Sequence, residues 1–175
     1  MMNKFLFKLS NYILFYIQKN YIVVESFTLF AGYFLCANIY HINMFKSIWY
    51  YNLLKPPFAP PDWIFSPVWS ILYCTIVIAL LLYIFKPAEN KKSGYIYFAT
   101  QLILNCLWTP AFFYLQNILL ALIIIILLDI FVLLTIYSFY KVSKFASLIL
   151  IPYLIWILFA TYLNIGYLIL NGYNF

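Results

Sequence analysis

Amide and aromatic side chains recur together on one face of an apolar segment in the middle of the chain. They stand four, three and four residues apart, at Gln101, Asn105, Trp108 and Phe112. This spacing places them on one side of a helix. Amides can hydrogen-bond a ligand, and indole and phenyl rings offer flat faces for stacking. The pattern predicts one wall of a pocket for a flat, largely apolar molecule.

A second stripe of the same kind lies on the last apolar segment. Its members, three or four residues apart, are Tyr153, Trp156, Ala160, Asn164, Tyr167 and Asn171. Ala160 leaves a gap in this face, while Pro152 near its start and Pro110 near the end of the other segment can each bend a helix and free a carbonyl. We therefore expect a pocket between the two segments. The alternative is hydrogen bonding between helices, worth about 0.6–2 kcal/mol, and it is the favoured interpretation for Gln101 alone.

Other residues with reactive side chains stand singly. Asp129 and Glu25 have no basic residue within their apolar segments, so we expect them to meet hydroxyls or amides. Hydrogen bonding between helices is favoured over proton relay for Asp129, and an interfacial position is favoured for Glu25. His41, the only histidine, is either an axial haem ligand or structural. The cysteines are Cys36, Cys74 and Cys106. Their spacing fits neither a disulfide nor a metal site, and we interpret them as packing residues.

The elements that must position these side chains are membrane-spanning helices. The chain is 67% hydrophobic and 8% charged, against about 45–50% and 25% in soluble domains. Five stretches approach or exceed the ~20 residues that cross a bilayer: residues 21–45, 64–85, 95–115, 118–140 and 146–170. The predicted fold is an all-α, five-helix membrane bundle over residues 21–175, preceded by a basic amphipathic extension over residues 1–20, with no room for a soluble catalytic domain.

The basic residues, all lysines, are distributed unevenly between the two expected sides of the membrane. Eight lie in the N-terminal segment and the second and fourth loops, and only Lys46 and Lys55 lie in the first loop. The positive-inside rule then predicts a cytoplasmic N-terminus and an external C-terminus. We expect a bacterial cell membrane, with an outer membrane of bacteria or mitochondria as the alternative. Because the lysines are split among loops, a nucleic-acid partner is not expected.

A stiff aromatic segment precedes the second expected span. Prolines at 56, 57, 60 and 61 keep Lys55–Asp62 from being helical, so it must lie at the interface or over the mouth of the bundle. We expect Asp62 or Ser66 to cap the following helix, with Pro67 in its first turn. The rings in and beside this segment form either an interfacial aromatic belt or a lid over a cavity. They are Trp49, Tyr50, Tyr51, Phe58 and Trp63.

Three blocks of sequence resemble the TspO/MBR family, the tryptophan-rich sensory proteins or translocator proteins, also called peripheral benzodiazepine receptors. They are WYYNLLKPPFAPPDWIFSPVWSILY at 49–73, QLILNCLWTPAFF at 101–113 and PYLIWILFATYLN at 152–164, about a third of the chain. The resemblance implies a five-helix bundle, often a homodimer, whose cavity opens under the first loop. The resemblance also implies that this cavity binds porphyrins, haem, sterols or drug-like molecules as ligands, and that no cofactor is required.

Carried over by position, the resemblance implies a set of ligand-binding residues. They are Trp49, Lys55, Phe58, Trp69, Asn105, Trp108, Tyr153, Trp156 and Ala160. Lys55 is either a cation for tetrapyrrole propionates or a headgroup anchor. The cholesterol motif of the family is not completed, because no Lys or Arg follows Tyr167.

The predicted function is binding of a tetrapyrrole within the bundle for sensing, sequestration or translocation. One alternative is an enzyme that degrades porphyrin in light, for which the resemblance implies Trp69 and Trp156 as photo-redox residues. Another is a proton-coupled carrier centred on Asp129. No metal site is predicted.

Overall fold

Only helices occur in the part of the chain that the structure, a computed structural model, describes, namely residues 48–88 and 90–172. In chain order they are α2 (Ile48–Asn52), the 3-10 turn η1 (Asp62–Ile64), α3 (Phe65–Phe85), α4 (Lys92–Thr109), the π-helical turn η2 (Pro110–Tyr114), α5 (Ile118–Tyr140), α6 (Lys144–Ile149) and α7 (Ile151–Asn171). The all-α prediction is confirmed for these ranges. The predicted extension over residues 1–20 and the predicted first span over residues 21–45 lie outside them.

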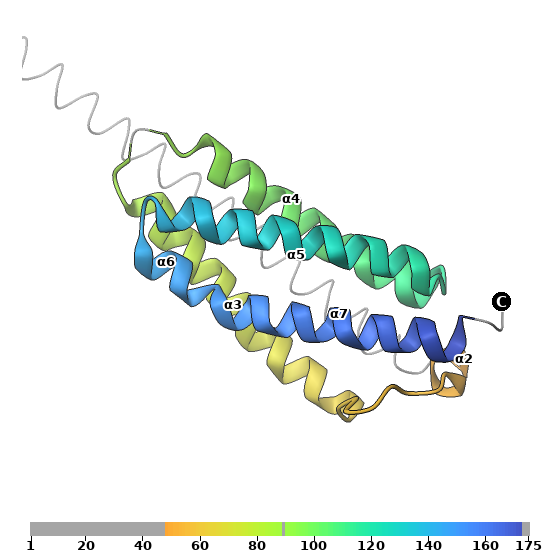
Figure 1. The fold of residues 1–175 in the computed structure, drawn as a ribbon. Helices are drawn as coiled ribbons and strands as arrows, with labels where there is room; N and C mark the ends of the chain where they lie inside the picture. Colours follow the sequence, from red (N-terminus) through yellow and green to blue (C-terminus); the bar gives the residue numbers. More distant parts are fainter. Residues whose placement is uncertain (1–47, 89, 173–175) are drawn as a thin grey trace, which may run out of the picture. The chain divides into compact units, whose positions relative to one another are not determined.

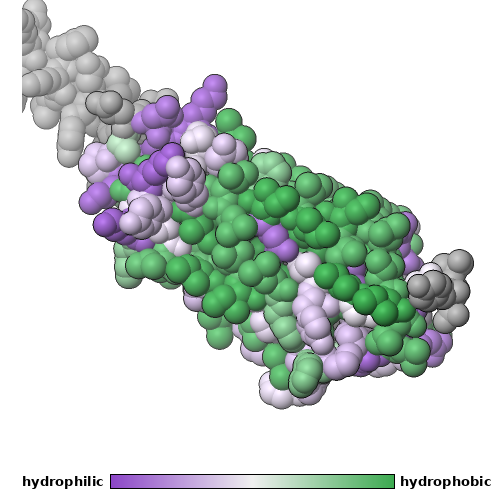
Figure 2. All heavy atoms as spheres, viewed as in Figure 1, coloured by the Kyte–Doolittle hydropathy of each residue, from purple (hydrophilic) through white to green (hydrophobic). Residues whose placement is uncertain are grey.

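Four of the expected spans are present within those ranges. They cover Asp62–Phe85, Lys92–Tyr114, Ile118–Tyr140 and Lys144–Asn171, each long and apolar enough to cross a membrane. The long helices run alongside one another, with α5 packed between α4 and α7 and the end of α3 against α6 (Figure 1). Apolar side chains cover their flanks, while polar ones gather at the end that carries the α3–α4 and α5–α6 connections (Figure 2). This distribution is that of a bundle immersed in lipid.

Prolines set the irregular points of two spans. After Pro110 the helix widens into the π turn η2, where the Pro110 carbonyl accepts from the Leu115 N–H at 2.9 Å. The last span, expected as one helix over 146–170, is divided at Leu150 into α6 and α7. Pro152, the second residue of α7, has no N–H to offer the preceding turn, which accounts for the division.

The predicted cap of the second span is wrong. Neither Asp62 nor Ser66 accepts a hydrogen bond from a helix N–H, and α3 instead follows directly from η1. Pro67 does lie in the first turn of α3, as expected. The Asp62 carboxylate instead accepts from the Tyr50 hydroxyl and Lys55 Nζ.

Two of the cysteines also depart from expectation. Cys74 and Cys106 are exposed, so the interpretation of these two as packing residues is wrong; Cys36 lies outside the described ranges. A thiol is apolar enough to face lipid at little cost, and helix periodicity does not distinguish a lipid-facing from a core-facing small residue.

Candidate functional site

A cavity of about 50 Å³ lies among the described helices. Its lining residues are Tyr50, Phe65, Trp69, Tyr73, Asn105, Trp108, Thr109, Phe112, Phe113, Ile125, Leu128, Trp156, Ile157, Ala160, Leu163, Asn164 and Tyr167. At roughly 10–15 Å³ for one water, it has room for a few water molecules. The walls are mostly aromatic and aliphatic. The two predicted stripes both contribute to them, with Asn105, Trp108 and Phe112 from the third span and Trp156, Ala160, Asn164 and Tyr167 from the fifth.

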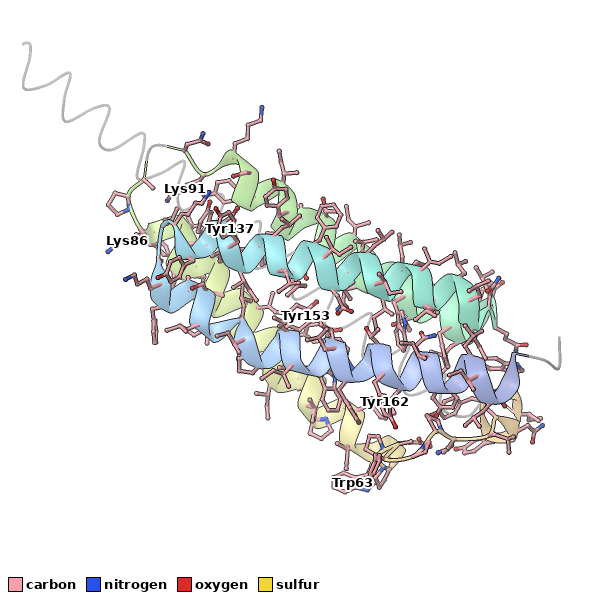
Figure 3. All side chains as sticks on the ribbon, viewed as in Figure 1. Trp63, Lys86, Lys91, Tyr137, Tyr153 and Tyr162 are labelled. Carbon is pink, nitrogen blue, oxygen red and sulfur yellow. The ribbon has the colours of Figure 1, made fainter. Side chains whose placement is uncertain are left out.

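A buried network of amide and phenol groups joins α4 to α7. The Tyr153 hydroxyl donates to Gln101 Oε1 at 2.9 Å and accepts from Asn105 Nδ2 at 3.0 Å. Asn105 Oδ1 accepts from the Tyr73 hydroxyl of α3 at 3.5 Å. Tyr153 is fully buried and points inward between the helices (Figure 3). Gln101 and Tyr153 therefore act as support behind the wall, and hydrogen bonding between helices is confirmed for Gln101.

A second amide ties the far end of the cavity together. Asn164 Oδ1 accepts from Trp108 Nε1 at 3.0 Å, and Asn164 Nδ2 donates to the Ile118 carbonyl at 3.0 Å. The indole of Trp108 is thereby held against the ring of Phe112, with the ring centroids 5.4 Å apart. One side chain thus orients an aromatic wall and fastens α7 to the start of α5.

The remaining indoles of the cavity are held by ring contacts. Trp69 stacks on Tyr73 at 5.3 Å between centroids, and Trp156 meets Phe65 edge-on at 5.8 Å. The Nε1 of Trp156 is buried and, in the part of the chain that the structure describes, has no hydrogen-bond partner. An unpaired buried donor is costly, so this side of the cavity has one hydrogen bond to offer an acceptor.

The proline segment, which we define as residues 53–61 between α2 and η1, is fastened at both ends. The Tyr50 hydroxyl donates to Asp62 Oδ1 at 3.1 Å and lies 3.4 Å from the Tyr167 hydroxyl. Lys55 Nζ also reaches Asp62 Oδ1, at 3.1 Å. Burial, followed by the contact with Tyr167, raises the pKa of the Tyr50 phenol far above its usual range. Tyr50 therefore remains a neutral donor, and Asp62 serves as the common acceptor.

Three contacts hold the proline segment to α7. Asn171 pairs with the backbone of Leu54 through both ends of its amide, accepting from the N–H at 2.9 Å and donating to the carbonyl at 3.1 Å. The Tyr162 hydroxyl donates to the Pro57 carbonyl at 3.0 Å. Gly166 lies under Pro56, and a Cβ on Gly166 would be 2.5 Å from the proline Cβ. The segment is thus seated on α7 by shape as well as by hydrogen bonds.

The structure brings together five of the nine positions named from the resemblance. Trp69, Asn105, Trp108, Trp156 and Ala160 line the cavity. The other four do not line it, and the ligand-binding role of the whole set stays a prediction.

Each of those four positions has another environment. Tyr153 lies behind the wall, and Trp49 meets Phe112 edge-on at 5.7 Å. Lys55 is paired with Asp62. Phe58 has φ of 60° in a turn and its ring is 86% exposed; Trp63, 72% exposed, likewise points away from the helices (Figure 3). Phe58 and Trp63 thus fit the interfacial belt, whereas Tyr50 and Phe65, which flank the proline segment, reach the cavity.

The sequence did not predict the contacts of the site that join residues far apart in the chain. Tyr50 read as one more belt aromatic, and Asp62 read as a helix cap. The available signal for Asp62 was its place seven residues from Lys55, within a proline-fixed turn. Asn171 was placed on the correct stripe, but nothing in its spacing indicates a backbone partner 117 residues away.

Comparisons with known proteins agree with one another. A model described as the TspO/MBR family matches residues 24–170. A tryptophan-rich protein TspO of Archaeoglobus fulgidus is 46% identical over 143 residues, covering 82% of this chain and 89% of that protein. A namesake from Chlorobaculum tepidum is 46% identical over 126 residues, covering 70% and 80%. The human translocator protein is 34% identical over 120 residues, covering 66% and 70%.

Proposed function

The chain belongs to the TspO/MBR family of multi-pass membrane proteins, and on that premise we propose that it binds a porphyrin or haem-type tetrapyrrole within its helices. The observation that carries the proposal is the cavity at which indoles from α3, α4 and α7 meet the amide of Asn105. A tetrapyrrole is a flat π system, and such a system stacks on indole and phenol rings. Tyr50 and Phe65 connect this cavity to both ends of the proline segment.

Binding a tetrapyrrole requires the cavity to enlarge. It measures about 50 Å³, whereas pockets for ligands of that size are typically several hundred Å³. We infer that the proline segment detaches from α7 to admit the ligand, because Tyr50 and Phe65 would then move with it. Lys55 would exchange the Asp62 carboxylate for a ligand propionate at the entrance, which keeps the cation paired.

Tryptophan fluorescence tests the proposal. Protoporphyrin should quench the emission of the purified protein saturably, with micromolar affinity. Trp156→Phe and Asn105→Ala should weaken binding, because each removes a group from the cavity. Trp63→Phe is the matched control, since that ring is 72% exposed and lies outside the cavity. Quenching that never saturates, or that is equally unaffected by all three substitutions, would refute the proposal.

A second candidate is light-driven oxidation of the bound porphyrin by dioxygen. It is favoured by the presence of both Trp69 and Trp156 in the cavity, the former stacked on Tyr73. Illumination of the aerobic complex should produce a bilin-like absorbance in the wild type. Identical bleaching in the Trp69→Phe/Trp156→Phe variant would exclude a role for these indoles.

The proposal also covers the first membrane span, the oligomeric state and the membrane in which the protein lies. We infer that residues 21–45 supply a fifth span, which the family match from residue 24 supports. A homodimer and a bacterial cell membrane are the expected context. Crosslinking in native membranes tests the first of these expectations, and fractionation of those membranes tests the second.

A further inference from the structure

Asp129 is a buried carboxyl group in the middle of α5. Its side chain is 8% exposed and faces α7, where Oδ2 lies 2.8 Å from the Thr161 hydroxyl. The other oxygen, Oδ1, is buried and has no hydrogen-bond partner among the described residues. The expectation that Asp129 meets a hydroxyl is confirmed, but half of the carboxyl group remains unsatisfied.

The number of hydrogens available at this contact indicates whether the Asp129 carboxyl group is protonated. Thr161 Oγ1 is 2.8 Å from Asp129 Oδ2 and 3.0 Å from the Ile157 carbonyl. A hydroxyl has one hydrogen, so it cannot donate fully to both oxygens. Both contacts are satisfied when the acid holds a proton and donates it to Thr161, which donates to Ile157. An ionised carboxylate would instead leave a charged oxygen in the membrane interior with no donor.

Within residues 48–88 and 90–172, the groups around Asp129 supply no compensating charge. From α7 the titratable group that interacts with it is Tyr153, and from α4 Cys106 interacts in turn with Tyr153; both side chains are ordinarily neutral. The titratable residues of α6 and η2 are Lys144 and Tyr114. Each lies at an end of its span, whereas Asp129 lies in the middle of α5. Among the described residues, Asp129 therefore has the Thr161 hydroxyl as its hydrogen-bond partner and no cation paired with it.

The acid and its hydroxyl partner are next in the chain to residues that line the cavity. Leu128 and Ala160, which line the cavity, immediately precede Asp129 and Thr161 in the chain. If the cavity opens enough to expose Asp129 as well, water in it would hydrate a carboxylate there. A large apolar ligand would expel that water and restore the environment that favours the neutral acid.

We propose that Asp129 is a proton-binding site whose occupancy is coupled to the ligand cavity, so that the proton and the ligand bind together. This coupling rests on the proposed tetrapyrrole function, whereas the proton site itself does not. The coupling is reciprocal. A ligand that makes protonation of Asp129 more favourable is bound more tightly when Asp129 is protonated. As pH rises through the ionisation of Asp129, ligand affinity should fall by up to about tenfold per pH unit, the limit for one proton.

Infrared spectroscopy tests the proton site without any ligand. The difference between wild type and Asp129→Asn near neutral pH should contain the C=O band of a protonated carboxylic acid. Asn is matched in size, and its amide can donate to Thr161 as the acid does. Carboxylate bands in place of the acid band would overturn the inference. If Asp129→Asn does not fold, Thr161→Val serves: the acid band should persist and shift as its hydrogen bond is lost.

Protoporphyrin titrations at several pH values test the coupling. Affinity should decline with rising pH in the wild type and be independent of pH in Asp129→Asn apart from the ligand's own ionisation. The same decline in both proteins would overturn the coupling. If no variant binds protoporphyrin while the acid band is present, the proposed function fails and the proton site stands.

Discussion

At the scale of single residues, Asn171 is the most specific contact between the proline segment and α7. Its amide serves both the N–H and the carbonyl of Leu54, and loss of such partners costs roughly 1–3 kcal/mol. Asn171→Ala should therefore accelerate hydrogen exchange of the Leu54 N–H by roughly 5- to 150-fold, measured by mass spectrometry. Asn90→Ala, at an exposed connection, is the control and should leave this exchange unchanged. An unaltered rate in Asn171→Ala would mean that the segment is held without this pair.

Gly166 should be sensitive for a steric reason. Replacing a helical glycine with alanine ordinarily stabilises a helix by about 1 kcal/mol, yet a Cβ here would be 2.5 Å from Pro56 Cβ. Gly166→Ala should displace the proline segment and raise hydrogen exchange across residues 53–61 while leaving α7 intact. Adding Pro56→Gly removes the obstructing ring and should restore protection. If the double variant exchanges as fast as Gly166→Ala, displacement of Pro56 is not the cause.

At this scale, the sequence establishes the direction of a side chain but not its hydrogen-bond partner. Spacing correctly assigned Asn105, Trp108 and Trp156 to inward faces, because helical periodicity fixes the direction of a side chain. It could not assign hydrogen-bond partners, since those depend on which helices meet. Asp62 illustrates the failure: a local cap was expected, and the structure instead gives it Tyr50 and Lys55.

At the scale of elements, the Lys91 side chain, next to the start of α4, caps the C-terminal end of α3. Its Nζ donates to the carbonyls of Tyr83 at 3.0 Å and Ile84 at 3.1 Å, and also to that of Lys86. Hydrogen bonds to a charged group are worth about 1.5–3 kcal/mol, and a cation suits this end of the helix dipole. Lys91→Met should lower the thermal unfolding midpoint in detergent by about 2–4 °C per kcal/mol lost.

The adjacent lysine provides the control for this prediction. Lys92 is exposed, so Lys92→Met removes the same charge from the same turn without uncovering the α3 carbonyls. Its unfolding midpoint should match that of the wild type. If both variants lower the unfolding midpoint equally, the effect is due to net charge and not to capping of the α3 carbonyls.

Element boundaries were predictable where the chain itself marks them. The bounds of α5 agree with the apolar run 118–140, and Asn117 caps it by accepting from the Leu120 N–H. The division between α6 and α7 was not predicted, because hydropathy continues through Leu150 and registers no change of helix. Pro152 was the available signal, and it was interpreted as a bend.

At the scale of the whole molecule, the described lysines separate by end. Lys86, Lys91, Lys92, Lys141 and Lys144 lie at the α3–α4 and α5–α6 connections, and the first two are seen together there (Figure 3). Lys55 lies at the opposite end, where it is paired with Asp62. Positive charge in short loops favours the cytoplasmic side, so the proline segment should face outward.

Cysteine labelling in intact cells checks this orientation. In a variant without native cysteines, Tyr51→Cys should react with a membrane-impermeant maleimide, because Tyr51 is exposed beside the proline segment. Ser93→Cys, exposed at the lysine-rich end, should react only after the membrane is permeabilised. The reverse pattern would place the proline segment in the cytoplasm. In that case a ligand admitted past Tyr50 and Phe65 would come from inside the cell, and uptake from the medium would need a different entrance.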